Sequence, residues 1–263
     1  MVTVEVEPPT ITKLSLEAIG AMDSAQIAAL TTEAFTALSN AQIAAIAVDA
    51  ITGLTPTQLA AMSCAGVQSL TSAQVDAMSD EQLLALNFST PLALDLTGDG
   101  LQTTAAEHGV PFDLCGFGVK KQVGWIAPSD GLLVLDVNGD GVINDGTELF
   151  GSGTRLADGS TAADGFIALV ALNSNPDGVI DANDAAFARL QVWQDANQDG
   201  VSDASELMAL AALNIVSLAL DADETAVMNN GNIIKLESSY TTTDGVTHQL
   251  VDVWLAGAVD AVA

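Results

Sequence analysis

An eight-residue repeat over residues 15–86 limits what the first third of this chain can fold into. Nine octads follow one another, and their fifth and eighth positions are apolar, from Ile19 and Met22 through Leu83 and Leu86. Each residue of an α-helix rotates by about 100°, so eight residues overshoot two full turns by about 80°. In a single long helix, the apolar positions would therefore spiral around the helix axis and would not share one face. The repeat therefore predicts a series of short helices separated by bends.

Each octad also begins with residues that are typical of a helix N-terminus. Its first position is usually Ser, Thr or Asp, and its fourth is often Gln, which is the pattern of a capping box. Four of these glutamines recur at intervals of sixteen residues: Gln26, Gln42, Gln58 and Gln74. We therefore expect residues 1–88 to form an octad-repeat helical solenoid in which one coil comprises two octads. A structural spacer is the expected role, and a ligand-binding groove is the alternative.

Charge separates this part of the chain from the rest. Residues 1–86 hold nine acids and one lysine, whereas residues 87–263 hold 25 acids and five bases. With the break at Asn87–Pro91, this shift predicts a second domain over residues 89–263. The net charge of −28 excludes a nucleic-acid binder, because phosphates would not be neutralised, and it favours cations as partners. No apolar run approaches the ~18 residues of a membrane span, so we expect no membrane insertion.

The second part contains a segment, DANQDGVSDASE at 195–206, with the spacing of a calcium-binding EF-hand loop. Calcium takes six to eight oxygen ligands, which such a loop supplies from its positions 1, 3, 5, 7, 9 and 12 around a glycine at position 6. The predicted ligands are Asp195, Asn197, Asp199, the Val201 carbonyl, Asp203 and Glu206. The flanking segments 182–194 and 206–214 are predicted to be helices, as the helix–loop–helix motif requires.

A second loop, NSNPDGVIDAND at 173–184, begins 22 residues earlier and has the same spacing of ligand positions. Its predicted ligands are Asn173, Asn175, Asp177, the Val179 carbonyl, Asp181 and Asp184. It has three carboxylates where the later loop has four, so we expect the weaker affinity here. The helix expected between the two loops would make them a compact EF-hand-like pair.

Two further loops depart from this spacing of ligand positions. In 136–148, Glu148 falls at the thirteenth position, and strand-like LLVL precedes the loop in place of a helix. Its predicted ligands are Asp136, Asn138, Asp140, the Val142 carbonyl and Glu148. In 95–100 the ligands would be Asp95, Thr97 and Asp99, but no acid stands at the twelfth position, so a turn without metal is the alternative.

The segments PLALDLTGDG, GWIAPSDGLLVLDVNGDGVINDGTELFG, LADGST and RLQVWQDANQDGVSDASEL resemble the self-processing module of FrpC-type repeat-in-toxin (RTX) proteins. The resemblance covers Pro91 to about Leu255, and the octads are similar to segments of such large proteins. It implies export by type I secretion, hence a secreted or cell-surface location. It also implies that calcium folds the module, which then cuts an Asp-Pro bond at its N-terminus and can join the new aspartyl end to a lysine.

This chain departs from the family pattern at two places. Thr90 precedes Pro91 where the family has aspartate, and the chain contains no Asp-Pro bond. In FDLCGFGV at 112–119, Cys115 and Phe117 replace two acids of a family loop, so we expect no calcium there.

We therefore predict an α+β protein, in which the octad solenoid precedes a calcium-binding module that contains an EF-hand-like loop pair. Calcium is the expected cofactor and partner, a protein or cell-surface partner stays unidentified, and no enzymatic activity is expected with Thr90 at the cleavage site. One alternative is the family's calcium-triggered autoproteolysis and ligation. The other is a cytosolic calcium sensor, which would need a methionine-rich target groove.

Overall fold

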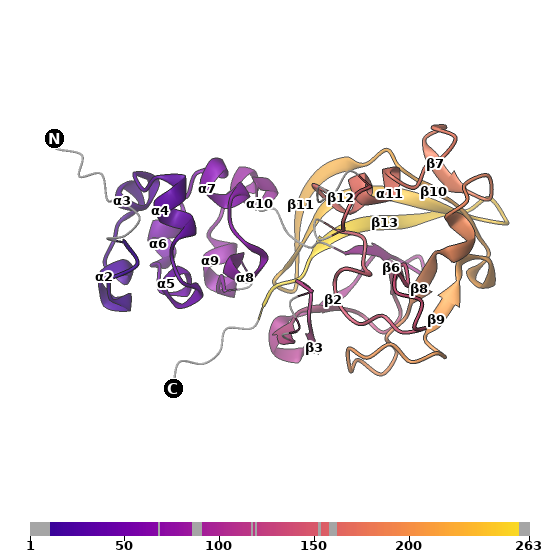
Figure 1. Cartoon of the computed structure of the whole chain (residues 1–263), viewed down its shortest axis with the longest axis horizontal. Coiled ribbons are helices and arrows are strands. Elements are labelled where there is room, and N and C mark those ends of the chain that lie inside the picture. The colour runs from indigo at the N-terminus through magenta and orange to yellow at the C-terminus, as the bar shows by residue number, and fades with distance from the viewer. Residues whose placement is uncertain are drawn as a thin grey trace. The chain divides into compact units, whose positions relative to one another are not determined.

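The computed structural model describes residues 11–67, 69–85, 91–116, 118, 120–151, 154–157 and 162–257 (Figure 1). The chain divides into two compact units. One comprises the chain up to Asn87 together with the segment from Ala256, and the other spans Phe88–Leu255. No helix in the described part of the chain is long and apolar enough to cross a membrane.

The first unit consists of short helices, one for each octad. They are α2 Leu16–Gly20, α3 Ser24–Ala28, α4 Thr32–Thr36, α5 Asn40–Ala44, α6 Val48–Ile51, α7 Pro56–Ala60, α8 Cys64–Val67, α9 Ser72–Asp76 and α10 Asp80–Ala85. The predicted capping boxes are confirmed at Asp23, Ser39, Thr55 and Thr71. The fifth positions described, from Ile19 to Val75, are buried, as predicted.

The glutamines of the octads join helices that are distant in the sequence. Gln58 Oε1 accepts the Thr55 N–H at 2.8 Å, while its Nε2 donates to the carbonyls of Ile27 and Leu30 at 3.0 and 2.9 Å. Gln42, Gln74 and Gln82 repeat this arrangement with carbonyls 28 and 31 residues earlier. Each of these four side chains therefore caps its own helix and also satisfies two backbone acceptors of a distant turn.

The predicted helical solenoid is wrong. The helices are short, as predicted, but they do not stack in coils of two octads, because each contacts the third helix along the chain, as α2 contacts α5 and α7 contacts α10. These contacts do not follow the sixteen-residue interval of the glutamines, which predicted coils of two octads. The interval reflects which octads carry Gln in their capping boxes, whereas the buried glutamines bond to carbonyls 28 and 31 residues earlier.

The second unit is mostly antiparallel β-structure. Its strands are β1 Leu92–Leu94, β2 Thr103–Thr104, β3 Val110–Phe112, β4 Lys121–Val123, β5 Trp125–Ile126, β6 Gly131–Val134, β7 Val179–Asp181, β8 Gln191–Trp193, β9 Leu207–Ala209, β10 Ile215–Ala219, β11 Asp223–Asn229, β12 Asn232–Thr242 and β13 Thr247–Trp254. The helical segments are α11 Gly165–Val170 and the 3₁₀ turns η1 Ala106–His108, η2 Phe187–Arg189 and η3 Leu210–Leu213.

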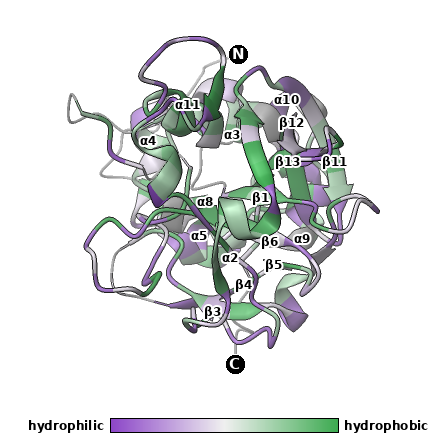
Figure 2. Ribbon diagram, turned by 90° about the vertical axis from the view of Figure 1, so that its right-hand side faces the viewer, coloured by the Kyte–Doolittle hydropathy of each residue, from purple (hydrophilic) through white to green (hydrophobic). Residues whose placement is uncertain are grey.

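One curled sheet dominates this unit, in the order β7-β10-β12-β13-β1-β6-β8-β9, with β11 paired to β12 (Figure 1). Both of its faces are covered. In β6, Leu132 and Val134 point into one apolar cluster and Leu133 into the other. This explains why β1 and β6 are continuous apolar runs, which are coloured hydrophobic in Figure 2 while many connecting loops are hydrophilic.

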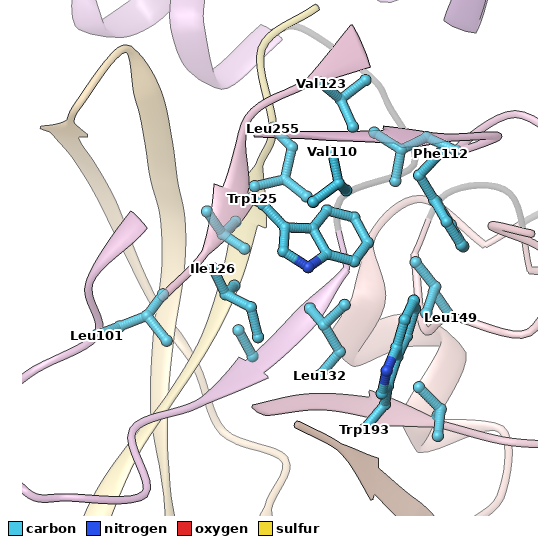
Figure 3. Packing of buried hydrophobic residues seen from close by; sticks show 14 of the residues in the cluster. Leu101, Val110, Phe112, Val123, Trp125, Ile126, Leu132, Leu149, Trp193 and Leu255 are labelled. Atoms are coloured by element: carbon cyan, nitrogen blue, oxygen red, sulfur yellow. The ribbon is translucent and has the colours of Figure 1, made fainter. Parts of the chain in front are cut away.

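An aromatic cluster forms the centre of one face (Figure 3). The rings of Phe112, Trp125 and Trp193 lie 5.1 to 5.6 Å apart, centroid to centroid, in tilted or edge-on contact. Such pairs add ~0.5–1.5 kcal/mol each beyond the burial of their area. Trp193 ends β8 just before Asp195, so this packing anchors the base of the loop at 195–206.

The predicted α+β fold is therefore corrected to an antiparallel β half-barrel with small helices. Segment 182–194 contains η2 and β8, and segment 206–214 contains β9 and η3, where EF-hand helices were expected. Alanine has the highest intrinsic helix propensity, but propensity is a small effect that tertiary contacts override. Pairing of Leu132 with Trp193 and of Trp193 with Leu207 places both flanks in the sheet instead.

The glutamine contacts give a test of the first unit. Gln58→Glu keeps the oxygen that caps α7 but replaces the buried donor by a carboxylate that faces two carbonyls. We expect the free energy of unfolding to fall by about 2 kcal/mol or more. Gln26→Glu is the matched control, because Gln26 makes the same capping box at an exposed position, and it should change stability by less than about 0.5 kcal/mol. Denaturant unfolding measures both, and equal losses would contradict the role assigned to the Gln58 amide.

Candidate cation-binding loops

The loops singled out in the sequence share one way of folding around their first residue. In each loop that begins with aspartate, Oδ2 of that residue accepts the N–H of the sixth-position glycine. The distances are 2.8 Å for Asp95, 2.5 Å for Asp113, 2.9 Å for Asp136 and 3.0 Å for Asp195. These glycines have φ between +67° and +86°, a conformation that an L side chain rarely adopts. The Asp-to-Gly spacing therefore encodes a closed turn.

The fifth position stabilises the same turn. The carboxylates of Asp140, Asp177 and Asp199 each accept the N–H of the residue two places later, at 2.8 to 3.1 Å. Asn175 and Asn197, at the third position, donate through Nδ2 to the fifth-position carboxylate at 2.8 and 3.0 Å. The predicted side chains at positions 3 and 5 therefore lie together in both of these loops.

The last acid of each long loop joins the loop's two ends. Glu206 Oε1 accepts the N–H of Ala196 and its Oε2 that of Asp203, both at 3.2 Å. Asp184 does the same for Ser174 and Asp181, at 2.7 and 3.1 Å. In both loops the donors are the second and ninth residues, so this acid is termed the closing carboxylate below.

Glu148 is the closing carboxylate of the loop at 136–148, although it stands one place late. Its Oε1 accepts the N–H of Val137 at 3.1 Å and its Oε2 that of Asn144 at 2.8 Å, which again are the second and ninth residues. Three loops with different sequences and different flanking elements thus share one hydrogen-bond frame. The sequence did not single out Asn144, whose Nδ2 also donates to Asp140 at 2.9 Å.

The loops pair differently from the prediction. Ser202 Oγ accepts the N–H of Ile143 at 2.6 Å and donates to its carbonyl at 3.3 Å. Each of these residues is the eighth of its loop, so 195–206 is joined to 136–148. The predicted EF-hand-like pair of 173–184 with 195–206, connected by a helix, is wrong. Because Ser202 is not a ligand position, the ligand spacing alone gave no indication of this contact.

Burial and charge distinguish the loops electrostatically. Asp195 is 1% exposed, and burial raises its pKa, as do the charges of Glu206 and Asp199. Hydrogen bonds lower the pKa of Asp140, chiefly the one from Asn144, and that of Asp184, chiefly the one from the N–H of Asp181. The loop at 195–206 therefore holds a buried carboxylate close to two further acids.

The calcium ligands expected from the sequence remain predictions. No cluster of three or more His, Cys, Asp or Glu side chains placed to hold a metal occurs among the described residues. Within the loops, the carboxylates mostly accept backbone N–H groups. In the loop at 113–118, where no calcium was expected, Asp113 closes the turn, and the Cys115 sulfur is disulfide-bonded. Thr90 and Phe117 lie outside the described residues.

Two comparisons with known proteins concern this unit. A family model described as the SPM domain matches residues 92–256. The iron-regulated protein FrpA of Neisseria meningitidis serogroup C is 51% identical over 169 residues. These residues are 63% of this chain but only 15% of that protein. The predicted resemblance to the FrpC type of protein is thus supported for the second unit. The family match does not extend to the octads.

The contact between loops gives a second test. Ser202 is 4% exposed, so Ser202→Ala would leave the N–H and carbonyl of Ile143 without their partner inside the protein. We expect a loss of about 1–3 kcal/mol in the free energy of unfolding. Ser205→Ala, at an exposed position of the same loop, is the control and should be nearly neutral. A Ser202→Ala variant as stable as the control would contradict the coupling of the two loops.

Proposed function

Because the chain belongs to the SPM domain family, we propose that its second unit is a calcium-binding module whose fold is stabilised by the ion. The observation that carries this proposal is the shared frame of the loops at 136–148, 173–184 and 195–206. In each, a closing carboxylate holds the second and ninth residues while the predicted ligand positions line the turn between them. A surface turn needs no such acid, whereas a calcium loop uses it to complete the ligand shell.

The residues present fit a hard cation. The predicted ligands of these three loops are carboxylate, amide or main-chain oxygens, which calcium prefers over nitrogen and sulfur. At the first position of 173–184, Asn173 Oδ1 is buried and has no hydrogen-bond partner. A buried oxygen without a partner costs free energy, and coordination of an ion would remove that cost. Asp195 and Glu206 supply the corresponding first and last ligands of the most acidic loop.

Calcium supplies positive charge that the loops lack. The chain carries a net charge of −28, so the acids of each loop repel one another until a cation neutralises them. Binding free energy then becomes folding free energy. We place the module outside the cell, as a secreted or cell-surface part of a longer type I exported protein. Extracellular modules bind calcium with dissociation constants of about 10⁻⁴–10⁻³ M, so such sites would be filled only after export.

Removal of calcium is the direct test of this proposal. In calcium at about one hundred times the dissociation constant, each site should add about 2.7 kcal/mol to the stability of the second unit. Calorimetry should therefore show a lower melting temperature in chelator, and Glu206→Gln should lose much of the calcium-dependent shift. Glu107→Gln, an exposed acid outside the loops, is the charge-matched control and should keep the shift. An unchanged melting transition of the unmutated chain in chelator would contradict the proposal.

We further infer that this module does not cut itself. In an Asp-Pro bond, the side-chain carboxylate can attack its own main-chain carbonyl carbon, closing a five-membered anhydride and releasing the proline nitrogen, which takes up a proton. The hydroxyl of Thr90 would have to close a four-membered lactone, which is too strained. Pro91 itself is held in place, since its carbonyl accepts the Val253 N–H at 3.0 Å. The self-processing alternative therefore requires a nucleophile that this chain does not have.

Restoring the aspartate tests this inference. The unmutated chain should stay intact in calcium, whereas Thr90→Asp should be cleaved into residues 1–90 and 91–263 if the calcium-loaded scaffold is competent. Thr90→Asn, which cannot form the anhydride, is the control and should stay intact. Electrophoresis and mass spectrometry report the products. Cleavage of the unmutated chain between Thr90 and Pro91 would contradict the inference.

A further inference from the structure

The first unit repeats one contact between helices that lie three octads apart. Helices α5, α6 and α7 are packed on two sides, by α2, α3 and α4 on one and by α8, α9 and α10 on the other. Among the described residues, α2, α3 and α4 make this extensive contact on one side only, and α2 and α3 lie at one end of the unit (Figure 1). The repeated contact therefore stops at α2 and α3.

Burial shows that this end of the unit is open. The fourth octad position is buried in each helix from α4 to α10, but it is exposed at Ala18 in α2 and at Gln26 in α3. The eighth position is buried after each helix from α3 to α9, but Met22, which follows α2, is only half-buried. The surface formed by Ala18, Met22 and Gln26 is termed the open octad face below.

Gln26 carries the hydrogen-bonding capacity of this face. Its Oε1 accepts the N–H of Asp23 at 2.9 Å, in the same kind of capping box that holds Gln58. Gln58 Nε2 also donates to the carbonyls of Ile27 and Leu30, the fifth and eighth residues of an earlier octad. No described residue accepts a hydrogen bond from Nε2 of the exposed Gln26. Gln26 therefore presents a pre-oriented donor without the pair of carbonyls that its buried counterparts hold.

A polar end that simply faces water is the alternative for this surface. Terminal repeats that close an array present a polar outer face to solvent. The open octad face instead combines the apolar side chains of Ala18 and Met22 with a single amide. The same combination is buried between later helices, where the Gln74 amide holds the carbonyls of Ile43 and Ile46. The composition of the face therefore fits burial under another octad.

We propose that the open octad face binds a further octad turn, which is supplied by additional octads joined ahead of Ser15 in the same polypeptide. The contact continues the one already present, because each buried glutamine holds carbonyls 28 and 31 residues earlier in its own chain. Octads joined ahead of this unit present such carbonyls in the correct register. This interaction surface belongs to the first unit and does not depend on calcium.

The test compares the full chain with an extended chain, in which a copy of residues 31–62 is inserted directly before Ser15. The insert contains four complete octads and no cysteine. It places copies of Ile43 and Ile46 at 31 and 28 residues before Gln26, the separations at which the octad glutamines bond in this structure. Denaturant unfolding, followed by the circular dichroism of the helices, measures the stability of both chains.

Gln26→Glu should raise the equilibrium constant for unfolding of the extended chain by about tenfold or more, because a carboxylate replaces the amide that faces two carbonyls. The same substitution in the unextended chain is the matched control and should change that constant by about twofold at most. Ala18→Asp is a second variant, and it should likewise be harmful only in the extended chain, where its position is buried.

Equal effects of these substitutions in the two chains would overturn the proposal. Added octads that contribute no helical circular dichroism would overturn it as well, because the face would then bind no octad. Sedimentation velocity tests the other source of an octad, a second copy of the chain. Self-association of the unextended chain that Gln26→Glu abolishes would overturn the assignment to preceding octads in the same polypeptide.

Discussion

The long acidic loops of the second unit depend on one interaction, in which a carboxylate accepts backbone N–H groups from both ends of a loop. Glu148, Asp184 and Glu206 each hold the second and ninth residues of their loops. This arrangement fixes where the turn opens and closes, but it also gathers acids that repel one another. The interaction that shapes each loop therefore leaves an excess of negative charge, for which a cation is the natural complement.

The sheet determines how the loops relate to one another. Trp193 pairs with Leu132 of β6 and Leu207 of β9, and its ring packs against Phe112 and Trp125. The loops at 136–148 and 195–206 leave these strands and meet through Ser202 and Ile143. An ion bound in either loop would thus stabilise residues that are already connected to the aromatic cluster. This connection explains how local coordination could change the stability of the whole unit.

Much of the local structure was predictable from the sequence. Capping boxes and the turns at Asp136 and Asp195 depend on hydrogen bonds between residues close in the chain, so spacing encodes them. The buried octad positions follow from the regular recurrence of apolar side chains. The flanks of 195–206 were mispredicted as helices because pairing with β6 outweighs the preference of the alanines. Ser202 was missed because it acts on a distant segment, and spacing within one loop contains no information about such a partner. The helical solenoid was mispredicted for a related reason, since the sixteen-residue recurrence of Gln does not reveal that their partners lie 28 and 31 residues earlier.

Backbone hydrogen exchange with and without calcium tests the central claim most directly, because the closing carboxylates act on backbone N–H groups. We predict that calcium slows exchange in residues 136–148, 173–184 and 195–206, and in strands β6 and β8 that support them. The octads at residues 15–85 should exchange at the same rate in both conditions. Loops that exchange equally fast with and without saturating calcium would contradict the claim that these loops are cation sites coupled to the fold.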